Sequence, residues 1–231
     1  MGLTADPAFT TTSFVVIDFE ATTPKGHPAQ PIEVAALALR HRHGDWEETG
    51  RSTSLICPPA FAPVTPLTTA QSGLTAEQFK HAPTPAVALG ALDARFATGR
   101  RYLLVAQHAA TEAGLIHRQR EHCPNLARLN FIDTIPLAKH LIPGLPDYRL
   151  DTLLTHFAIP MPPDRHRALA DVEVTAQVFF RLIAAADHDP QLSDLAALEK
   201  VAGRTAKSNL PAQGGLFDLE TPSNPSYQPE P

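Results

Sequence analysis

One stretch of the sequence decides the fold: FVVIDFE, residues Phe14–Glu20. Its first four residues form a continuous apolar run rich in β-branched side chains, which predicts a strand buried on both faces. Side chains at positions i and i+2 of a strand share a face, so Asp18 and Glu20 point together where this strand ends. Two adjacent carboxylates beside a core strand are costly unless a cation or hydrogen bonds compensate them. A divalent metal ion would do so; alternatively, the strand simply ends and both residues are solvated.

Strand-like and helix-like patterns alternate along the chain from about Ser13 to Leu198. Besides the first strand, we predict strands over Ile32–Arg40, Ser52–Cys57 and Tyr102–Ala106, and helices over Pro85–Ala97, Glu112–Glu121, Thr134–Leu141, Leu150–Phe157 and Ala168–Ala184. The residues His43–Trp46 have the chemistry of a hairpin turn, and the Ala-rich Ile32 segment could instead be helical. This order indicates an α/β domain of three layers with a mixed sheet.

Composition bounds the class of protein. The chain has 231 residues, 43% of them hydrophobic, as in ordinary globular domains. No apolar run is long enough to span a bilayer, residues 1–12 lack a secretory signal, and two isolated cysteines form neither a disulfide framework nor a zinc motif. We therefore expect a cytoplasmic protein with no membrane partner. The net charge of −5 argues against a general nucleic-acid coat protein but not against a nuclease.

The chain divides into three regions. We expect a flexible N-terminus over residues 1–12, a single domain over residues 13–200, and a disordered Pro-rich tail over residues 201–231. The tail has five prolines from residue 204 onward, with Ser, Asn and Gln between them and few apolar residues. Such a composition cannot bury enough apolar surface to fold alone.

A second group of polar residues opens the long helix predicted from Ala168. Asp171 lies near the start of that helix, and His166 lies in the loop or cap before it. A loop histidine beside a metal-binding aspartate could take a proton from a metal-bound water. The alternative is an exposed histidine together with an aspartate that stabilises the positive end of the helix dipole.

The two groups and their order resemble the DnaQ-like DEDDh 3′→5′ exonuclease family, related to the DNA polymerase III epsilon subunit. The resemblance covers nearly the whole domain. It is carried by the DFE motif at Asp18–Glu20 and the motif HRALAD at His166–Asp171. Further stretches that resemble the family are SGLT at Ser72–Thr75, FIDT at Phe131–Thr134 and YRLDTL at Tyr148–Leu153.

The resemblance implies a ribonuclease H-like fold with a five-stranded mixed sheet flanked by helices, and two-metal hydrolysis of nucleic-acid 3′ ends. Two Mg²⁺ or Mn²⁺ ions would be held by four carboxylates, and His166 would be the general base. The backbone around Phe19 and the side chain of Thr22 would lie near the terminal nucleotide. The four carboxylates implied are Asp18, Glu20, Glu112 and Asp171.

Glu112 is a departure from the family's second motif. The family usually has His-Asn-Ala-x-Phe-Asp, whereas this chain has Gln107, His108, Ala109 and, further on, Thr111 and Glu112. The carboxylate is retained but is one methylene longer, and Mg²⁺ requires near-ideal octahedral geometry. The altered ligand could weaken one metal, slow the reaction or favour Mn²⁺. An alternative is therefore a weakly active or inactive module that binds nucleic-acid ends or the sliding clamp.

The tail contains the peptide QGGLF at residues 213–217. It resembles the Gln-x-x-Leu-Phe peptide that bacterial replication and repair proteins dock on the β sliding clamp. Leu216 and Phe217 cannot bury themselves in a polar tail, and inserting them into a partner's groove, with Gln213 alongside, would bury them. They could instead fold back onto this domain. Clamp docking would favour DNA over RNA as substrate and a role in replication or repair.

Overall fold

The structure is a computed structural model that describes residues 2–210. Its strands are β1 (Ser13–Thr22), β2 (Gln30–Arg42), β3 (Asp45–Leu55), β4 (Tyr102–Ala106), β5 (Phe131–Asp133) and β6 (Gly203–Arg204). Its α-helices are α1 (Pro7–Thr11), α2 (Pro66–Ser72), α3 (Pro85–Asp93), α4 (Ala109–Arg118), α5 (Thr134–Leu141), α6 (Leu150–His156), α7 (Ala168–Ala186) and α8 (Leu195–Ala202). Short 3₁₀ turns are η1 (Leu3–Ala5), η2 (Ala76–Phe79), η3 (Ala94–Phe96), η4 (Leu126–Arg128), η5 (Pro190–Leu192) and η6 (Lys207–Asn209).

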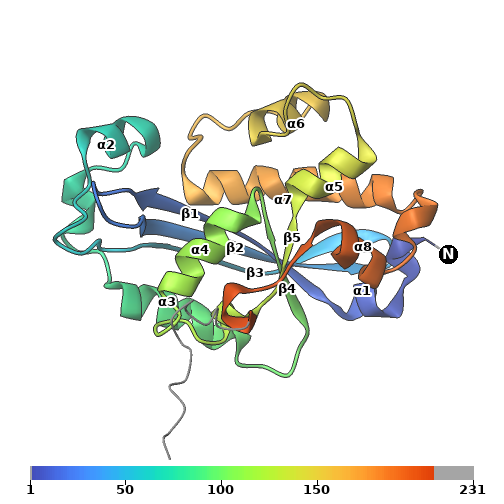
Figure 1. The fold of residues 1–231 in the computed structure, drawn as a ribbon, viewed down its shortest axis with the longest axis horizontal. Helices are drawn as coiled ribbons and strands as arrows, with labels where there is room; N and C mark the ends of the chain where they lie inside the picture. The colour runs from blue at the N-terminus through green and yellow to red at the C-terminus, as the bar shows by residue number, and fades with distance from the viewer. Residues whose placement is uncertain (1, 211–231) are drawn as a thin grey trace, which may run out of the picture.

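The strands form one mixed sheet in the order β3-β2-β1-β4-β5-β6. β4 runs parallel to β1 and β5, whereas β2 runs antiparallel to both of its neighbours and β6 antiparallel to β5. Helices cover both faces, with α5, α6 and α7 on one side and α3 and α4 on the other (Figure 1). The predicted three-layer α/β class is confirmed. The predicted count of five strands is wrong by one, because the two-residue β6 adds an edge strand.

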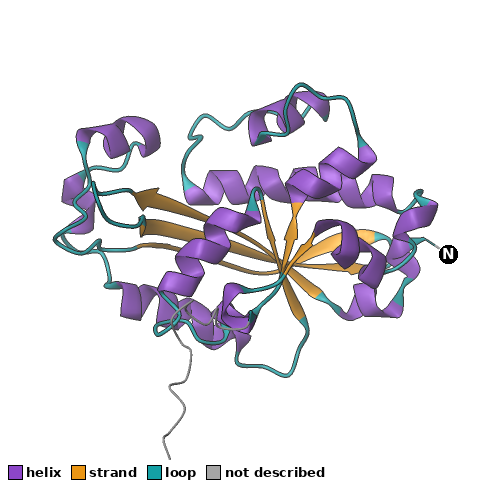
Figure 2. Cartoon of the chain, viewed as in Figure 1, coloured by secondary structure: helices purple, strands orange, loops and turns teal. Residues whose placement is uncertain are grey.

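β1 lies at the centre of the sheet and is buried on both faces. Phe14 and Val16 pack in the core with α7, whereas Ile17 and Phe19 point to the opposite core beneath α3 and α4. Figure 2 shows these helices on either side of the strands. A strand covered on both faces has a continuous apolar run rather than an alternating one, which explains FVVI. Asp18 and Glu20 continue the alternation of Phe14 and Val16, so both carboxylates point to the side of the sheet that α7 covers.

The remaining predicted elements differ from the observed ones mainly at their ends. β2 is a strand despite its alanines, because it is paired on both sides. β3 begins at Asp45 rather than Ser52, and the hairpin turn before it is His43–Gly44, with φ of 53° and 90°. Positive φ at both central residues is what a type I′ turn requires. Trp46 therefore belongs to β3, where its ring stacks on Phe180 at a centroid distance of 4.8 Å.

The N-terminal segment is folded, in contrast to the flexible segment that we expected. Phe9 in α1 has no exposed surface, and its ring lies 4.8 Å from that of Phe14. The carboxylate of Asp6 caps α1 by accepting from Ala8 N at 3.0 Å and caps α8 by accepting from Leu195 N at 2.8 Å. Long-range packing thus orders a segment that is too short to show a pattern of its own.

The folded region also extends past residue 200, where we expected the disordered tail to begin. α8 ends at Ala202 and is followed by β6 and η6. Asn209 Nδ2 donates to Arg128 O at 2.8 Å and so attaches this segment to η4. The clamp-like peptide with Gln213, Leu216 and Phe217 lies outside the described residues. Among the described helices, none is long and apolar enough to cross a membrane.

Candidate functional site

The β1 carboxylates lie at one end of the central strand and on one face of the sheet. Asp18 and Glu20 are each partly exposed. Burial, followed by the charge of Asp171, raises the pKa of Asp18 from 3.8 to about 7. Burial, followed by the charge of Asp18, raises the pKa of Glu20 from 4.5 to about 8. These shifts mean that the surroundings of the two acids supply too little positive charge and too few hydrogen bonds to stabilise their ionised forms.

Asp171 and His166 meet Glu20 at the start of α7. One ligand atom from each of Glu20, His166 and Asp171 can be chosen so that all three lie within 4.8 Å of one another. Asp171 is 7% exposed, and its Oδ1 is buried without a hydrogen-bond partner among the described residues. His166 is exposed and has a φ of 66°, so the loop turns sharply just before the helix. The structure therefore brings together two of the predicted carboxylates and the predicted base.

Glu112 reaches the same site from α4, on the other side of the sheet. It is only 4% exposed, and its Oε2 is buried without a partner within residues 2–210. Burial raises the pKa of Glu112 well above its ordinary value, and the charge of Asp18 raises it further. Glu112 is thus a buried acid coupled to the β1 carboxylates. Glu112 is therefore not a solvated residue on the surface of α4.

Two acids that the sequence analysis did not single out as site residues hold these helices in place. Glu33 of β2 is 3% exposed, and its Oε2 accepts from Ala168 N, the first residue of α7, at 3.0 Å. Arg167 contributes a forked pair, with Nη2 at 2.7 Å from Oε1 and Nε at 3.1 Å from Oε2 of the same carboxylate. Asp133 accepts from Ala109 N at 2.9 Å and so anchors the start of α4.

The sequence contains an indication that the starts of α7 and α4 need acceptors such as Glu33 and Asp133 from elsewhere in the chain. α7 has Arg167 at its N-cap and α4 has His108, and neither is a preferred capping residue. A helix start without a local acceptor needs a distant one. Capping rules could therefore have indicated that an acid elsewhere closes each helix, although only the fold identifies which acid.

The altered residues of the second motif have defined local roles. Gln107 Nε2 donates to Tyr148 O at 2.8 Å, and its Oε1 accepts from the Thr134 hydroxyl, so it joins the end of β4 to α5 and to the segment before α6. His108 has a φ of 66°, a conformation that Asn, Asp and His adopt more readily than other non-glycine residues. Its Nδ1 lies 2.9 Å from the Thr111 hydroxyl. Gln107 and His108 therefore both have hydrogen-bond partners in this fold.

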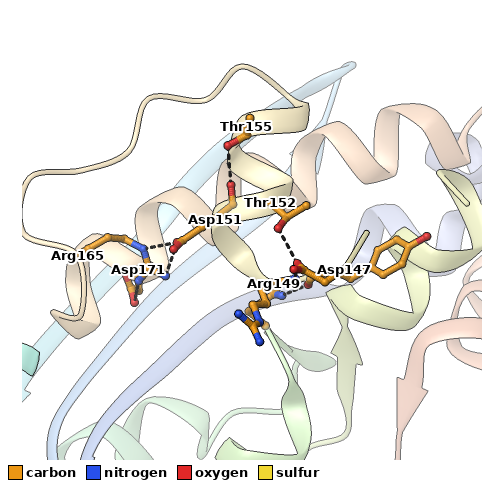
Figure 3. A network of polar contacts seen from close by, with 9 residues as sticks. Asp147, Arg149, Asp151, Thr152, Thr155, Arg165 and Asp171 are labelled. Atoms are coloured by element: carbon orange, nitrogen blue, oxygen red, sulfur yellow. Dashed lines mark hydrogen bonds and ion pairs between the residues drawn. The ribbon is translucent and has the colours of Figure 1, made fainter. Parts of the chain in front are cut away.

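Arg165 is a cation already at the site. Its Nε and Nη2 donate to Asp151 Oδ1 at 3.0 and 2.8 Å, and its Nη1 donates to Asp171 Oδ2 (Figure 3). Just before α6, which carries Asp151, Asp147 accepts from Arg149 N at 3.0 Å (Figure 3). The charge of Arg165 opposes the upward pKa shifts of Asp18, Glu20 and Asp171 without cancelling them. One arginine therefore compensates only part of the negative charge.

The arrangement fits a divalent cation. Two buried carboxylate oxygens without partners, one on Glu112 and one on Asp171, are costly unless another group satisfies them. The ligands on offer are hard carboxylate oxygens with one imidazole, a set that suits magnesium and manganese. Asp18, Glu20, Glu112 and Asp171 are the residues that could hold such ions.

The two residues predicted near the terminal nucleotide do not offer free side chains. Phe19 is 7% exposed and packs in the core beneath α3 and α4. Thr22 is 2% exposed, and its hydroxyl donates to Pro63 O at 3.3 Å. Any contact of this strand with a nucleotide would therefore come from the strand's backbone. The contact with the terminal nucleotide stays a prediction.

Curated proteins that are similar to this chain include DNA polymerases III of the PolC type. The chain is 27% identical over 171 residues to the PolC-type DNA polymerase III of Caldanaerobacter subterraneus subsp. tengcongensis, covering 74% of this chain and 11% of that protein. It is 35% identical over 95 residues to the PolC-type DNA polymerase III of Listeria innocua serovar 6a, covering 40% of this chain and 6% of that protein. The chain thus spans about a tenth or less of these relatives' length.

Solved nucleases share the fold. A 3′-exonuclease solved for its recognition of the histone mRNA stem-loop has a TM-score of 0.63 at 17% identity, over 87% of this chain and 93% of that one. The nuclease domain of 3′hExo, a DEDDh family member bound to rAMP, has a TM-score of 0.63 at 19% identity, over 79% and 96%. Exonuclease I of E. coli with a dT13 oligonucleotide has a TM-score of 0.61 at 14% identity, over 76% and 41%.

The family model for the RNase_T exonucleases matches residues 15–179, which include Asp18, Glu20, Glu112 and Asp171. The resemblance to DnaQ-like DEDDh exonucleases and the ribonuclease H-like fold that it implied are both confirmed. This chain belongs to the exonuclease family.

Proposed function

We propose that the chain is a 3′→5′ exonuclease that hydrolyses the terminal phosphodiester of nucleic acid and releases nucleoside monophosphates. One observation carries the proposal. The end of β1 and the first turns of α4 and α7 bring acids with raised pKa values together beside an exposed histidine. These acids come from distant parts of the sequence, from Asp18 to Asp171. Such a cluster is destabilising for a structural domain and useful for binding metal ions.

Exonucleases of this family use divalent metal ions. We infer two Mg²⁺ or Mn²⁺ ions, held by Asp18, Glu20, Glu112 and Asp171. When bound, such ions lower the pKa of the attacking water and stabilise negative charge on the leaving oxygen. If Asp171 Oδ2 becomes a ligand, Arg165 competes with the ion for that oxygen, and its two bonds to Asp151 can hold it nearby when it moves away.

His166 is the general base in this proposal. Hydrolysis joins a water oxygen to phosphorus and breaks the bond to the 3′ oxygen of the preceding nucleotide. A ring nitrogen of His166 accepts the proton that the water loses, and the departing 3′ oxygen takes a proton from solvent to become the new 3′ hydroxyl. The histidine is exposed, so it can return the proton to solvent. Glu33 positions it indirectly, because the carboxylate fixes the start of α7 immediately after the loop that carries His166.

In our proposal the favoured substrate is DNA and the process is replication or repair. We propose a cytoplasmic location. The support is the similarity to PolC-type DNA polymerase III and the clamp-like peptide in the tail. The second candidate, a binding module with little activity, is favoured by the replacement of aspartate with Glu112 and by the Arg165–Asp171 pair. The buried position of Glu112 beside Asp18 supports the active enzyme.

Degradation of end-labelled nucleic acid tests the activity. With Mg²⁺ or Mn²⁺, a 5′-labelled oligonucleotide should shorten from its 3′ end, and His166→Ala should slow the reaction by about 10²–10⁴-fold because general base catalysis is lost. His188→Ala, which removes another exposed histidine, serves as the matched control and should keep full activity. If neither metal gives a rate above that of Asp18→Ala, the chain is not an exonuclease.

Glu112 can be tested by changing its length and charge separately. Glu112→Asp should preserve or raise the rate, because it restores the shorter carboxylate that the family usually has. Glu112→Ala and Glu112→Gln should abolish activity, because each removes a metal-binding charge. The measurement is the initial rate with each metal, and indifference to all three changes would place Glu112 outside the working site.

The raised pKa values predict how the stability of the metal-free protein depends on pH. Asp18 and Glu20 ionise near pH 4 when unfolded but at about pH 7 and 8 when folded. Between these limits the folded state binds more protons, so stability should fall as pH rises from 5 to 8. At pH 8 with a chelator, Asp18→Asn should therefore have a higher Tm than the wild type.

Metal binding should reverse that loss. Mn²⁺ or Mg²⁺ at pH 8 should raise the Tm of the wild type, because the ions bind the folded state, and should raise that of Asp18→Asn much less. Asp45→Asn, at an exposed position of the hairpin, is the control and should respond like the wild type. A Tm that does not change with either metal would rule out the proposed centre.

The role of the tail can be tested by a binding measurement that does not depend on catalysis. Leu216→Ala combined with Phe217→Ala should abolish binding of the full chain to a bacterial β sliding clamp, because these two side chains supply the apolar contact in the proposed complex. Surface plasmon resonance against immobilised clamp measures the interaction, with Leu219→Ala as the control. Equal binding by wild type and double variant would remove the clamp from the proposal.

A further inference from the structure

The two oxygens of the Asp171 carboxylate have different surroundings. Oδ2 accepts a hydrogen bond from Arg165 Nη1, whereas Oδ1 is buried and has no hydrogen-bond partner among the described residues. Asp171, Glu20 and His166 each offer one ligand atom within 4.8 Å of the other two. The carboxylate therefore has one oxygen that the protein holds and one oxygen that a ligand can still satisfy.

Arg165 is itself held at the other edge of its guanidinium. Its Nε and Nη2 donate to Asp151 Oδ1 at 3.0 and 2.8 Å, so one guanidinium links Asp151 to Asp171 (Figure 3). The side chain of Arg165 is 16% exposed and that of Asp151 is 56% exposed. The contact with Asp171 is thus the buried end of this link, and the contact with Asp151 is its exposed end.

The exposed end of the link belongs to a packed helix. Asp151 lies in the first turn of α6, and its backbone carbonyl accepts from the Thr155 hydroxyl at 2.9 Å (Figure 3). Leu153 and Leu154 of the same helix are buried in the core that α7 shares. Helix packing therefore sets the position of Asp151 relative to α7, and Asp151 in turn sets that of Arg165.

Charge alone would give Arg165 the opposite effect on metal binding. Burial raises the pKa of Asp171, and the hydrogen bond and the charge of Arg165 only reduce that rise. A cation beside the site repels metal ions, so removing its charge alone would strengthen their binding. If Arg165 instead orients Asp171, removing it would weaken their binding. The two roles thus predict changes of opposite sign.

We propose that Arg165 is a positioning residue for metal binding: anchored by Asp151, it holds Asp171 through Oδ2 and leaves Oδ1 free for the ion. This inference rests on the proposed function, because the ions are those that Asp171 would help to bind. Hydrogen bonds from the surrounding protein orient metal-binding carboxylates, and their loss costs about 10–100-fold in metal affinity or activity. Neither Arg165 nor Asp151 is itself a ligand in this proposal.

Calorimetric titration of the full chain with Mn²⁺, in the absence of nucleic acid, tests this role. Arg165→Gln should weaken Mn²⁺ binding by about 10–100-fold, although it removes a positive charge from the site. Arg165→Lys keeps the charge but lacks the planar fork that can join two carboxylates, so it should also weaken binding. Asp151→Ala removes the anchor of Arg165 and should weaken binding as well.

Two control variants separate orientation from general charge. Arg149→Gln removes an exposed arginine next to α6, and Asp164→Ala removes an exposed acid of the loop that carries Arg165. Neither should weaken Mn²⁺ binding to the extent that the Arg165 and Asp151 variants do. A Tm measurement in EDTA shows which variants are folded, and Asp151→Ala changes a side chain exposed enough for the fold to tolerate its loss.

Cleavage at increasing Mn²⁺ concentration gives a second readout. A high concentration should return the rate of Arg165→Gln towards that of the wild type, because the defect is in metal affinity. The rate of His166→Ala should stay low at every concentration, because its defect is in proton transfer.

Mn²⁺ binding that is unchanged or tighter in Arg165→Gln would overturn the proposal, since Arg165 would then act only by its charge. An equal loss of affinity in Asp164→Ala would overturn it too, because any change of charge in the loop would have the same effect. A wild type that does not bind Mn²⁺ would instead remove the metal centre of the proposed function, so the two failures are distinguishable.

Discussion

Electrostatic repulsion among four carboxylates is the constraint on which the rest of this structure depends. Asp18, Glu20, Glu112 and Asp171 come from three elements that the fold forces together, and burial leaves each with a raised pKa. Such a site persists only if the surrounding structure is stable enough to tolerate it. The central strand provides that stability, because it is covered by packed helices on both faces.

The helices that deliver the acids are held by other acids. The buried Glu33 fixes the start of α7 and Asp133 that of α4, so the positions of Asp171 and Glu112 follow from hydrogen bonds to backbone N–H groups. A carboxylate at a helix start interacts favourably with the helix dipole. The chain thus uses Glu33 and Asp133 as fixed supports that accept from backbone N–H groups. It leaves the four carboxylates of the site with raised pKa values, which a ligand can relieve.

Positive charge is also distributed unevenly between the acidic site and its surroundings. Arg165 lies inside the acidic site and compensates part of its charge, whereas Arg118 and Lys207 lie outside it and have no acidic partners among the described residues. A protein with a net charge of −5 can in this way still present a local positive surface. Long-range attraction for a polyanion then depends on where charges lie rather than on their sum.

The sequence by itself indicated the family through its motifs, and it named the central strand and all five proposed metal and base residues, because motifs and the alternation of side chains along a strand are local properties. FVVIDFE places Asp18 and Glu20 on one face whatever surrounds them. Only the tertiary structure decided that Glu112 is buried beside Asp18, that Glu33 and Asp133 close the two helices, that residues 2–12 are packed, and that Lys207 meets Arg118. Each of these depends on contacts between residues distant in sequence, which no local pattern records.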